Sequence, residues 1–157
     1  MSPALLDGRR AGAAAGGGFA PPEGWPDAHD ERFLGLRLAQ MRGDASLQPW
    51  LARAMLLRTR QRPMIGHIGF HRPPDERGAI EMGYTVLPLY RRRPCALEAA
   101  QAMMEWACEH GVRLFRLSVS PANAPSLAMA AKMGVRHVSE QVDEDDGPEL
   151  ILELARE

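Results

Sequence analysis

Cysteine and lysine are scarce in this chain. Its 157 residues include two cysteines, Cys95 and Cys108, which are too few to give a domain of this length a disulfide framework. Neither cysteine lies in a Cys-x-x-Cys pattern or among histidines at the spacing of metal ligands. Lys132 is the only lysine, so the basic charge is carried by arginine. We therefore expect two free thiols and no metal cofactor.

Long apolar stretches and an excess of one charge are absent as well. No segment reaches the roughly 18 to 20 apolar residues of a membrane span, and residues 1–3 lack the basic and then apolar layout of a secretion signal. Nineteen Lys and Arg residues face twenty Asp and Glu residues, so the formal net charge is -1 and offers no general attraction to nucleic acid or an anionic membrane. We expect a cytoplasmic protein that binds neither.

The composition is that of one compact domain over residues 1–157, with 45% hydrophobic and 25% charged residues. Residues 1–30 are predicted to form a variable, partly loose segment, because residues 11–20 are low in complexity and contain three consecutive glycines. An amphipathic helix is predicted after Asp30 and ends near Gly43. Its apolar positions are Phe33, Leu34, Leu36 and Leu38.

Strand and helix patterns alternate in the remaining sequence. Three apolar segments separated by turn-forming residues predict antiparallel strands at 50–60, 64–70 and 79–87. A helical stripe follows over 96–107, formed by Ala96, Ala99, Ala100, Met103 and Ala107. A strand at 112–119, a helix from Asn123 to Met133, and a hairpin of 135–142 with 149–154 complete the order. The fold class is α/β: a mixed, mostly antiparallel sheet covered by helices on its faces.

The segment 86–96 joins a strand to the long helix and carries three consecutive arginines. Unpaired backbone N–H groups and the helix dipole favour an anion at such a junction, and the small Ala96 lets the main chain approach closely. Phosphate suits this place because its oxygens accept several hydrogen bonds at once. The alternative is a solvated basic helix start without a ligand.

Residues 64–154 resemble the GNAT superfamily of acetyl-CoA-dependent N-acetyltransferases, most closely its ribosomal-protein-alanine acetyltransferase branch. The pyrophosphate motif of that family, Gln or Arg, two residues, Gly, one residue, Gly or Ala, falls on Arg91, Pro94 and Ala96. A second signature, Asn-x-x-Ser followed by Lys-x-Gly and an apolar residue, falls on Asn123, Ser126, Lys132, Gly134 and Val135. The order of the predicted strands agrees with the family, and the resemblance makes 64–154 an acetyl-CoA-binding core.

The resemblance implies a central pair of strands that splay apart to admit the pantetheine arm of acetyl-CoA, with Gly83 placed for a bulge. It implies that a backbone N–H near Val86 polarises the thioester carbonyl, and that Asn123 caps a helix and bonds the pantetheine arm. The cofactor-binding residues implied in this way are Thr85, Val86, Leu87, Arg91, Arg92, Arg93, Pro94, Cys95, Ala96, Asn123 and Ser126.

Glu81 is the candidate general base by the same resemblance, and its alternative is a surface glutamate paired with an arginine. Ser126 is the candidate that bonds the coenzyme or reprotonates the thiolate. The implied reaction is direct attack of a primary amine, of a small molecule or a peptide N-terminus, on the thioester. A homodimer would be in keeping with the family. The first helix, residues 73–77 and the final hairpin are expected to select the acceptor.

Two positions depart from the family pattern. Pro94 stands where the family usually has glycine and lacks the N–H of a phosphate donor, although proline is tolerated in the first turn of a helix. Ala130 stands where many relatives carry a tyrosine that acts as general acid. These departures keep open a non-catalytic acyl-CoA-binding module. His67 and His71 could share a face, but a third metal ligand is not evident.

Overall fold

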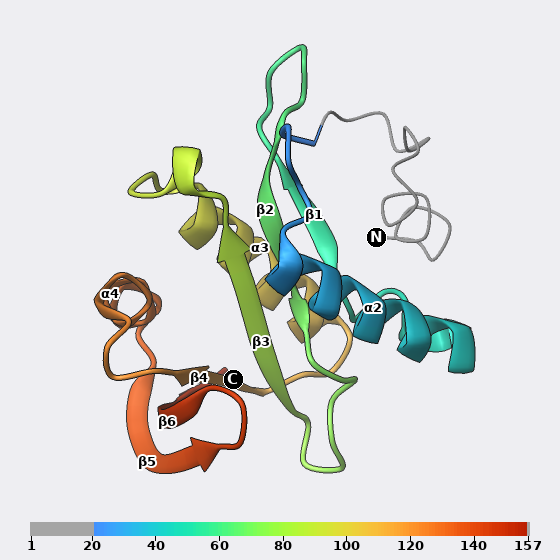
Figure 1. The fold of residues 1–157 in the computed structure, drawn as a ribbon. Helices are drawn as coiled ribbons and strands as arrows, with labels where there is room; N and C mark the ends of the chain where they lie inside the picture. The colour runs from blue at the N-terminus through green and yellow to red at the C-terminus, as the bar shows by residue number, and fades with distance from the viewer. Residues whose placement is uncertain (1–20, 157) are drawn as a thin grey trace. The chain divides into compact units, whose positions relative to one another are not determined.

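The computed structural model describes residues 21–156 (Figure 1). Most of the segment predicted to be loose, residues 1–30, therefore lies outside the described residues. The described chain divides into two compact units: the first runs to Gly69 and includes Tyr84–Arg92, and the second contains Phe70–Gly83 and the chain from Arg93 onward. That residues 1–157 make a single domain stays a prediction.

Six strands share one sheet in the order β1-β2-β3-β4-β6-β5. β3 pairs in parallel with β4, whereas β1 with β2, β4 with β6 and β5 with β6 are antiparallel. A mixed sheet with helices confirms the predicted α/β class. The strands are β1 Arg53–Leu56, β2 Met64–Phe70, β3 Ala79–Val86, β4 Leu114–Val119, β5 Arg136–Asp143 and β6 Gly147–Ala155.

The first unit contains helix α2, Ala28–Gly43, and the short 3-10 helix η1, Ala45–Leu47. The Asp27 carboxylate caps α2 by accepting a hydrogen bond from the Asp30 N–H. The apolar face of α2 is fully buried and belongs to a core of Leu34, Leu38, Met41 and Leu51. Leu36 is 56% exposed, so this leucine does not belong to the buried face that the sequence pattern suggested.

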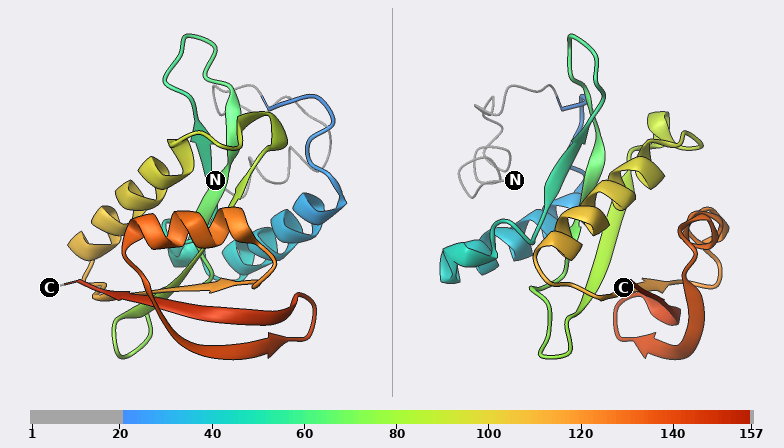
Figure 2. Two further views of the ribbon diagram at one scale, coloured as in Figure 1. Left: turned by 90° about the vertical axis from the view of Figure 1, so that its left-hand side faces the viewer. Right: turned by 180° about the vertical axis from the view of Figure 1, so that it is seen from behind.

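The second unit contains helices α3, Cys95–Glu109, and α4, Ala124–Met133. α4 contacts α3 and β4, and the left view of Figure 2 shows it running alongside β4. The predicted stripe of α3 is buried at Ala96, Ala100, Met103 and Ala107, with Met104 buried in place of Ala99. None of the helices in residues 21–156 is long and apolar enough to cross a membrane.

Candidate functional site

The predicted site residues divide between the two units. Thr85, Val86, Leu87, Arg91 and Arg92 belong to the first unit. The second unit holds the other candidates, which are Glu81, Arg93, Pro94, Cys95, Ala96, Asn123 and Ser126. Each unit therefore presents its own part of the candidate site, and each part has its own supporting contacts.

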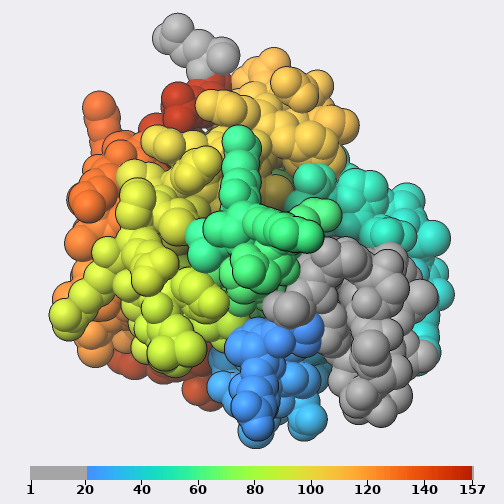
Figure 3. Space-filling model, turned by 90° about the horizontal axis from the view of Figure 1, so that it is seen from above, coloured from blue at the N-terminus to red at the C-terminus, as the bar shows by residue number. Residues whose placement is uncertain are grey.

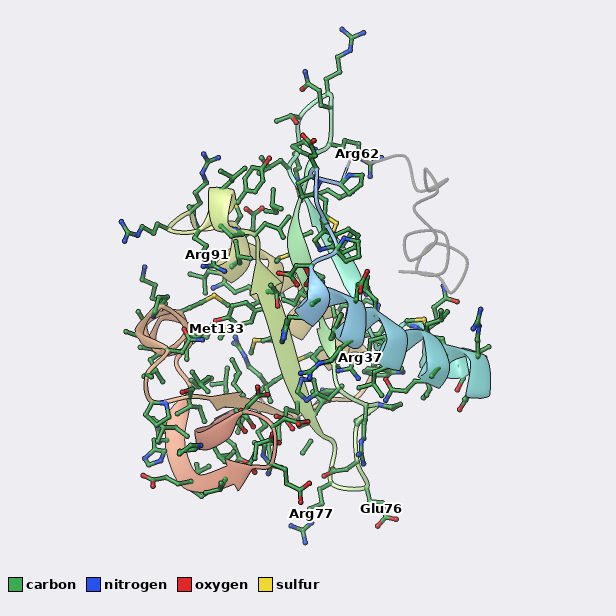
Figure 4. The ribbon with its side chains drawn as sticks, viewed as in Figure 1. Arg37, Arg62, Glu76, Arg77, Arg91 and Met133 are labelled. Atoms are coloured by element: carbon green, nitrogen blue, oxygen red, sulfur yellow. The ribbon has the colours of Figure 1, made fainter. Side chains whose placement is uncertain are left out.

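Three contacts within the first unit fix the end of β3. The Leu87 N–H donates to the Ile65 carbonyl at 2.9 Å, and the Arg91 Nε donates to the Val86 carbonyl at 3.1 Å. Gly66 brings β2 so close to β3 that an added Cβ would clash with the Thr85 carbonyl oxygen. Figure 4 shows Arg91 beside the end of β3. Because its amide is occupied, buried Leu87 offers a ligand no donor.

The turn after β3 exposes its basic side chains. It begins with the 3-10 helix η2, Pro88–Tyr90, and the exposed Arg91, Arg92 and Arg93 follow. This part of the chain, yellow-green in Figure 3, lies on the surface in that view. Arg92 has a φ of 62°, the left-handed region, which costs a non-glycine residue about 1 kcal/mol. The unfavourable φ of Arg92 thus lies within the three consecutive arginines of this turn.

The start of α3 accommodates the proline that departs from the family motif. Pro94 is the N-cap residue with φ -70° and ψ -5°, and its carbonyl accepts the Glu98 N–H at 3.0 Å. The φ of proline is fixed near this value, so the ring introduces no strain at this position. The first amides of α3 have no acceptor one turn earlier in the helix, as at any helix N-terminus. The predicted helix start is confirmed, and Ala96 is buried in it.

Asn123 caps α4, as predicted. Its side-chain oxygen accepts the Ser126 N–H at 3.2 Å. The cap occupies Oδ1 of Asn123, so the amide NH₂ is the part of this side chain that could bond a ligand. Ser126 lies half-buried in the first turn of α4.

Glu81 lies in the second unit at the end of the ladder between β3 and β4. That ladder pairs Ala79–Glu81 with Leu114–Arg116, although both strands run on for several residues. The Ser118 hydroxyl donates to the Glu81 Oε1 at 2.6 Å, and the His71 Nδ1 lies 3.6 Å from the same oxygen. The Glu81 side chain is 31% exposed. A carboxylate thus stands, partly accessible, where two parallel strands stop pairing.

The arginine opposite Glu81 has another partner. Arg116 pairs in register with Glu81 but donates from Nε and Nη2 to Glu153 Oε1 on β6, at 3.0 and 2.6 Å. The alternative for Glu81 was a surface glutamate paired with an arginine. Arg116, the arginine opposite it, pairs with Glu153 instead. The contacts of Glu81 are instead a hydroxyl and an imidazole.

Gly83 provides the space for that imidazole. A Cβ at residue 83 would lie 2.7 Å from the His71 Nε2. The bulge expected at Gly83 stays a prediction. The register shifts recorded in the β1–β2 and β5–β6 pairs lie between Met55 and Leu56 and between His137 and Ser139. What the structure assigns to Gly83 is close approach by His71.

Sequence reasoning missed His71 and Ser118 as partners of Glu81. Ser118 alternates with buried Leu117 and Val119 on β4, so its polar side chain could have been placed on the face of Arg116. His71 directly follows β2, and only the pairing of strands reveals that it lies opposite Glu81. His67, its predicted neighbour on one face, has a separate partner: its Nε2 lies 3.1 Å from Asp30 Oδ1 in the first unit.

Acidic side chains line a shallow cavity of about 330 Å³ in the second unit. Pro121 and residues of the β5–β6 hairpin form it, with Glu140 and Glu149 as its charged groups. Across residues 21–156, no group of three His, Cys, Asp or Glu side chains has the arrangement needed to hold a metal ion.

Comparison with a protein family model finds a match to the acetyltransferase (GNAT) domain over residues 18–136, three quarters of the chain. A stretch of 44 residues is 41% identical to the uncharacterised N-acetyltransferase YjdG of Bacillus subtilis, and covers 28% of this chain. That stretch spans 26%, or about a quarter, of the length of the curated relative.

Solved structures of acetyltransferases are similar in fold. The ribosomal-protein-alanine N-acetyltransferase of Brucella melitensis matches with a TM-score of 0.62 at 18% identity, over 78% of each chain. The yncA protein of Salmonella typhimurium, solved with its cofactor acetyl-CoA, matches with a TM-score of 0.61 at 17% identity, over 78% of this chain and 73% of that one. At these identities the likeness concerns the fold.

Proposed function

The chain belongs to the acetyltransferase (GNAT) family, and from this premise we propose that it transfers the acetyl group of acetyl-CoA to a primary amine, of a small molecule or of a protein N-terminus. The observation that carries the proposal is Glu81, a partly exposed carboxylate held by a 2.6 Å hydrogen bond from Ser118 where the β3–β4 ladder ends. A positioned carboxylate is a suitable acceptor for the proton of an alkylammonium substrate.

Each part of the candidate site has its own proposed contacts with acetyl-CoA. We assign the pyrophosphate to the arginines 91–93 and the first amides of α3, residues 95 and 96, beside Pro94. The strand end at Thr85, Val86 and Leu87 is assigned to the pantetheine arm and the thioester. Asn123 contributes its amide NH₂, and Ser126 its hydroxyl. The helix start and the cap at Asn123 support these assignments.

The reaction needs a neutral amine. Glu81 takes a proton from the acceptor ammonium, directly or through one water molecule. The amine nitrogen then attacks the thioester carbonyl carbon, a C–N bond forms, and the C–S bond breaks with the electron pair leaving on sulfur. The nitrogen loses its second proton as the amide forms, and this proton goes to the thiolate. Ser126 is our candidate for passing it on, taking up the proton from nitrogen as its hydroxyl gives one to sulfur, since the position of the usual tyrosine is Ala130, which is 1% exposed. The products are an amide, free CoA and one proton.

A cationic amine is the acceptor that the charges of the second unit favour. Glu140 and Glu149 line the shallow cavity beside the hairpin that the sequence singled out for acceptor selection. Apolar Val142 and Leu150 contribute to the same cavity. Carboxylates beside apolar walls suit an ammonium group on an alkyl chain. We further propose a single domain over 1–157 that works in the cytoplasm, with a homodimer as the assembly.

A non-catalytic acyl-CoA-binding module is the second candidate. Ala130 favours it, because the usual tyrosine general acid is missing from that position. A binding module would be stabilised by acetyl-CoA without turning it over. Release of free CoA in the presence of an amine separates the two functions.

The test is thiol release from acetyl-CoA across a panel of small amines, polyamines and peptides with free N-termini. Glu81→Gln should lower kcat by about 100-fold or more, because the amide cannot accept the proton, while leaving CoA affinity by calorimetry nearly unchanged. Glu109→Gln, at the exposed C-terminal end of α3, is the matched control and should retain full turnover. Wild-type turnover in Glu81→Gln would remove Glu81 from the mechanism, and no turnover of any amine would favour the binding module.

A further inference from the structure

We propose that His71 receives from Glu81 the proton of the acceptor amine and delivers it to solvent. The inference rests on the proposed role of Glu81 as the base. His71 would act through Glu81 and would not touch the substrate, so it is a positioning and relay residue of the same site.

The backbone sets His71 and Glu81 opposite each other. The His71 N–H donates to the Glu81 carbonyl at 2.9 Å, which continues the pairing of the chain just after β2. Residues paired in this way direct their side chains to the same face of the sheet. Their side chains meet with 3.6 Å between the His71 Nδ1 and the Glu81 Oε1. A small rotation of the ring, or one bridging water, completes a proton path across that distance.

Gly83 and Ser118 hold the two side chains in this arrangement. The His71 ring occupies the space that any side chain at residue 83 would need, with Nε2 2.7 Å from the ideal Cβ position. Ser118 donates its hydroxyl hydrogen to the Oε1 of Glu81, which orients the carboxylate toward the ring. Ser118 carries no charge and leaves His71 as the ionisable partner that meets this oxygen.

Charges on the neighbouring strands are already paired. Glu81 comes from β3, Ser118 and Arg116 come from β4, and Glu153 comes from β6. Arg116 donates twice to Glu153, so its positive charge is balanced at that pair. Glu81 and His71 are the two ionisable groups whose side chains meet at Glu81 Oε1. An imidazole changes charge between pH 5 and 8, the range in which such an enzyme would work.

Each turnover liberates one proton. The acceptor ammonium gives it to the Glu81 carboxylate, which becomes a neutral carboxylic acid. The acid passes the proton to the unprotonated Nδ1 of His71, so the carboxylate is restored and the imidazole becomes a cation. The His71 side chain is 45% exposed, against 31% for Glu81, and it returns the proton from its ring to water. Glu81 is then ready for the next ammonium.

Two variants test the relay by kinetics. His71→Asn keeps an amide donor near the Nδ1 position but cannot ionise, so kcat should fall about 10-fold or more and the pH profile should lose its ionisation between pH 5 and 8. His71→Ala should be partly restored by added imidazole. His110→Asn, at an exposed histidine that ends α3, is the control and should keep the wild-type profile. A His71→Asn profile that overlays the wild type would overturn the relay.

A measurement without substrate separates this inference from the proposed function. The His71 ring resonances are followed by NMR against pH in the wild type and in Glu81→Gln. The carboxylate favours the charged imidazole, so the titration of His71 should move to lower pH when Glu81 loses its charge. An unchanged titration would refute the coupling between His71 and Glu81, even if the enzyme is active. A shifted titration with no turnover of any amine would leave the coupling in place and refute the acetyl transfer.

Discussion

Asp30 and His67 place an ionisable pair inside the first unit. Each is 3% exposed, with the His67 Nε2 3.1 Å from the Asp30 Oδ1, and Phe33 stacks on the His67 ring at a centroid distance of 4.3 Å. Burial alone would raise the pKa of Asp30, but the hydrogen bond and charge of His67 outweigh it and hold that pKa below its usual value. The pair therefore fastens the start of α2 to β2 through its charged carboxylate.

Removing the Asp30 carboxylate should destabilise the protein. Asp30→Ala leaves the buried His67 ring without its partner, and we expect a loss of about 1 to 3 kcal/mol at pH 7 by urea unfolding. The folded-state pKa of Asp30 is depressed, so its contribution is present above the unfolded-state pKa and is lost as pH falls through the folded value. The difference in free energy of unfolding between the wild type and Asp30→Asn should therefore become smaller toward acid pH. A difference that grew at acid pH would contradict the lowered pKa of Asp30.

At the scale of elements, the junction between β3 and α3 combines two unusual residues. Arg92 takes a left-handed φ of 62°, and Pro94 caps the helix without a side-chain hydrogen bond. The φ of Pro94, -70°, is available to every residue, so the site does not need the backbone freedom of glycine there. What proline removes is an N–H at the edge of the proposed phosphate site. The consequence of the departure from the motif is thus a missing donor.

Restoring that donor should tighten CoA binding. Pro94→Ala and Pro94→Gly both supply an N–H, and each should lower the Kd for CoA measured by calorimetry by about 3- to 10-fold. Both should also lower stability, Gly by roughly 0.5 to 1 kcal/mol and Ala by less, because the unfolded chain gains freedom. Ala serves as the control that separates the new donor from flexibility. Unaltered Kd values in both variants would show that Pro94 does not weaken CoA binding.

The sequence predicted the bounds of an element correctly where its hydrophobic pattern agrees with the strand pairing or helix that forms. The prediction for β2 coincides with Met64–Phe70, and the long helix and the final hairpin lie where periodicity placed them. The first strand was predicted over residues 50–60, but only Arg53–Leu56 pairs. Hydrogen bonds of Trp50 and Leu51 to the Leu47 carbonyl turn the chain before the strand, and Leu51 is buried in the core with α2. An apolar run does not distinguish a strand from a buried turn.

At the scale of the whole molecule, the sequence motifs identified the family but not the partners of Glu81, the proposed base. The cap at Asn123 is local, three residues from its donor, and was predictable. Glu81 and Ser118 are 37 residues apart, and their contact depends on the register of β3 with β4. His71 likewise meets Glu81 through strand pairing. Register is a property of the assembled sheet, which no local pattern in one sequence reveals.

The net charge of -1 gives the molecule no general attraction for a coenzyme with several phosphates, so affinity must come from local charge. Acetyl-CoA at 100 times its Kd should stabilise the protein by about 2.7 kcal/mol, or roughly 5 to 10 °C in Tm. Replacing Arg92 and Arg93 by Gln should reduce this shift at fixed ligand concentration, and added salt should reduce it in the wild type.

The matched control replaces the exposed Arg58 and Arg60, between β1 and β2, by Gln and removes the same total charge from another turn. If binding depends on the cations next to the start of α3, this control keeps the full thermal shift, because Arg58 and Arg60 do not belong to the turn that precedes α3. Equal reductions of the thermal shift in both double variants would mean that acetyl-CoA binding depends only on the total charge of the protein. That result would remove the basic turn from the proposed phosphate site while leaving Glu81 and His71 untouched.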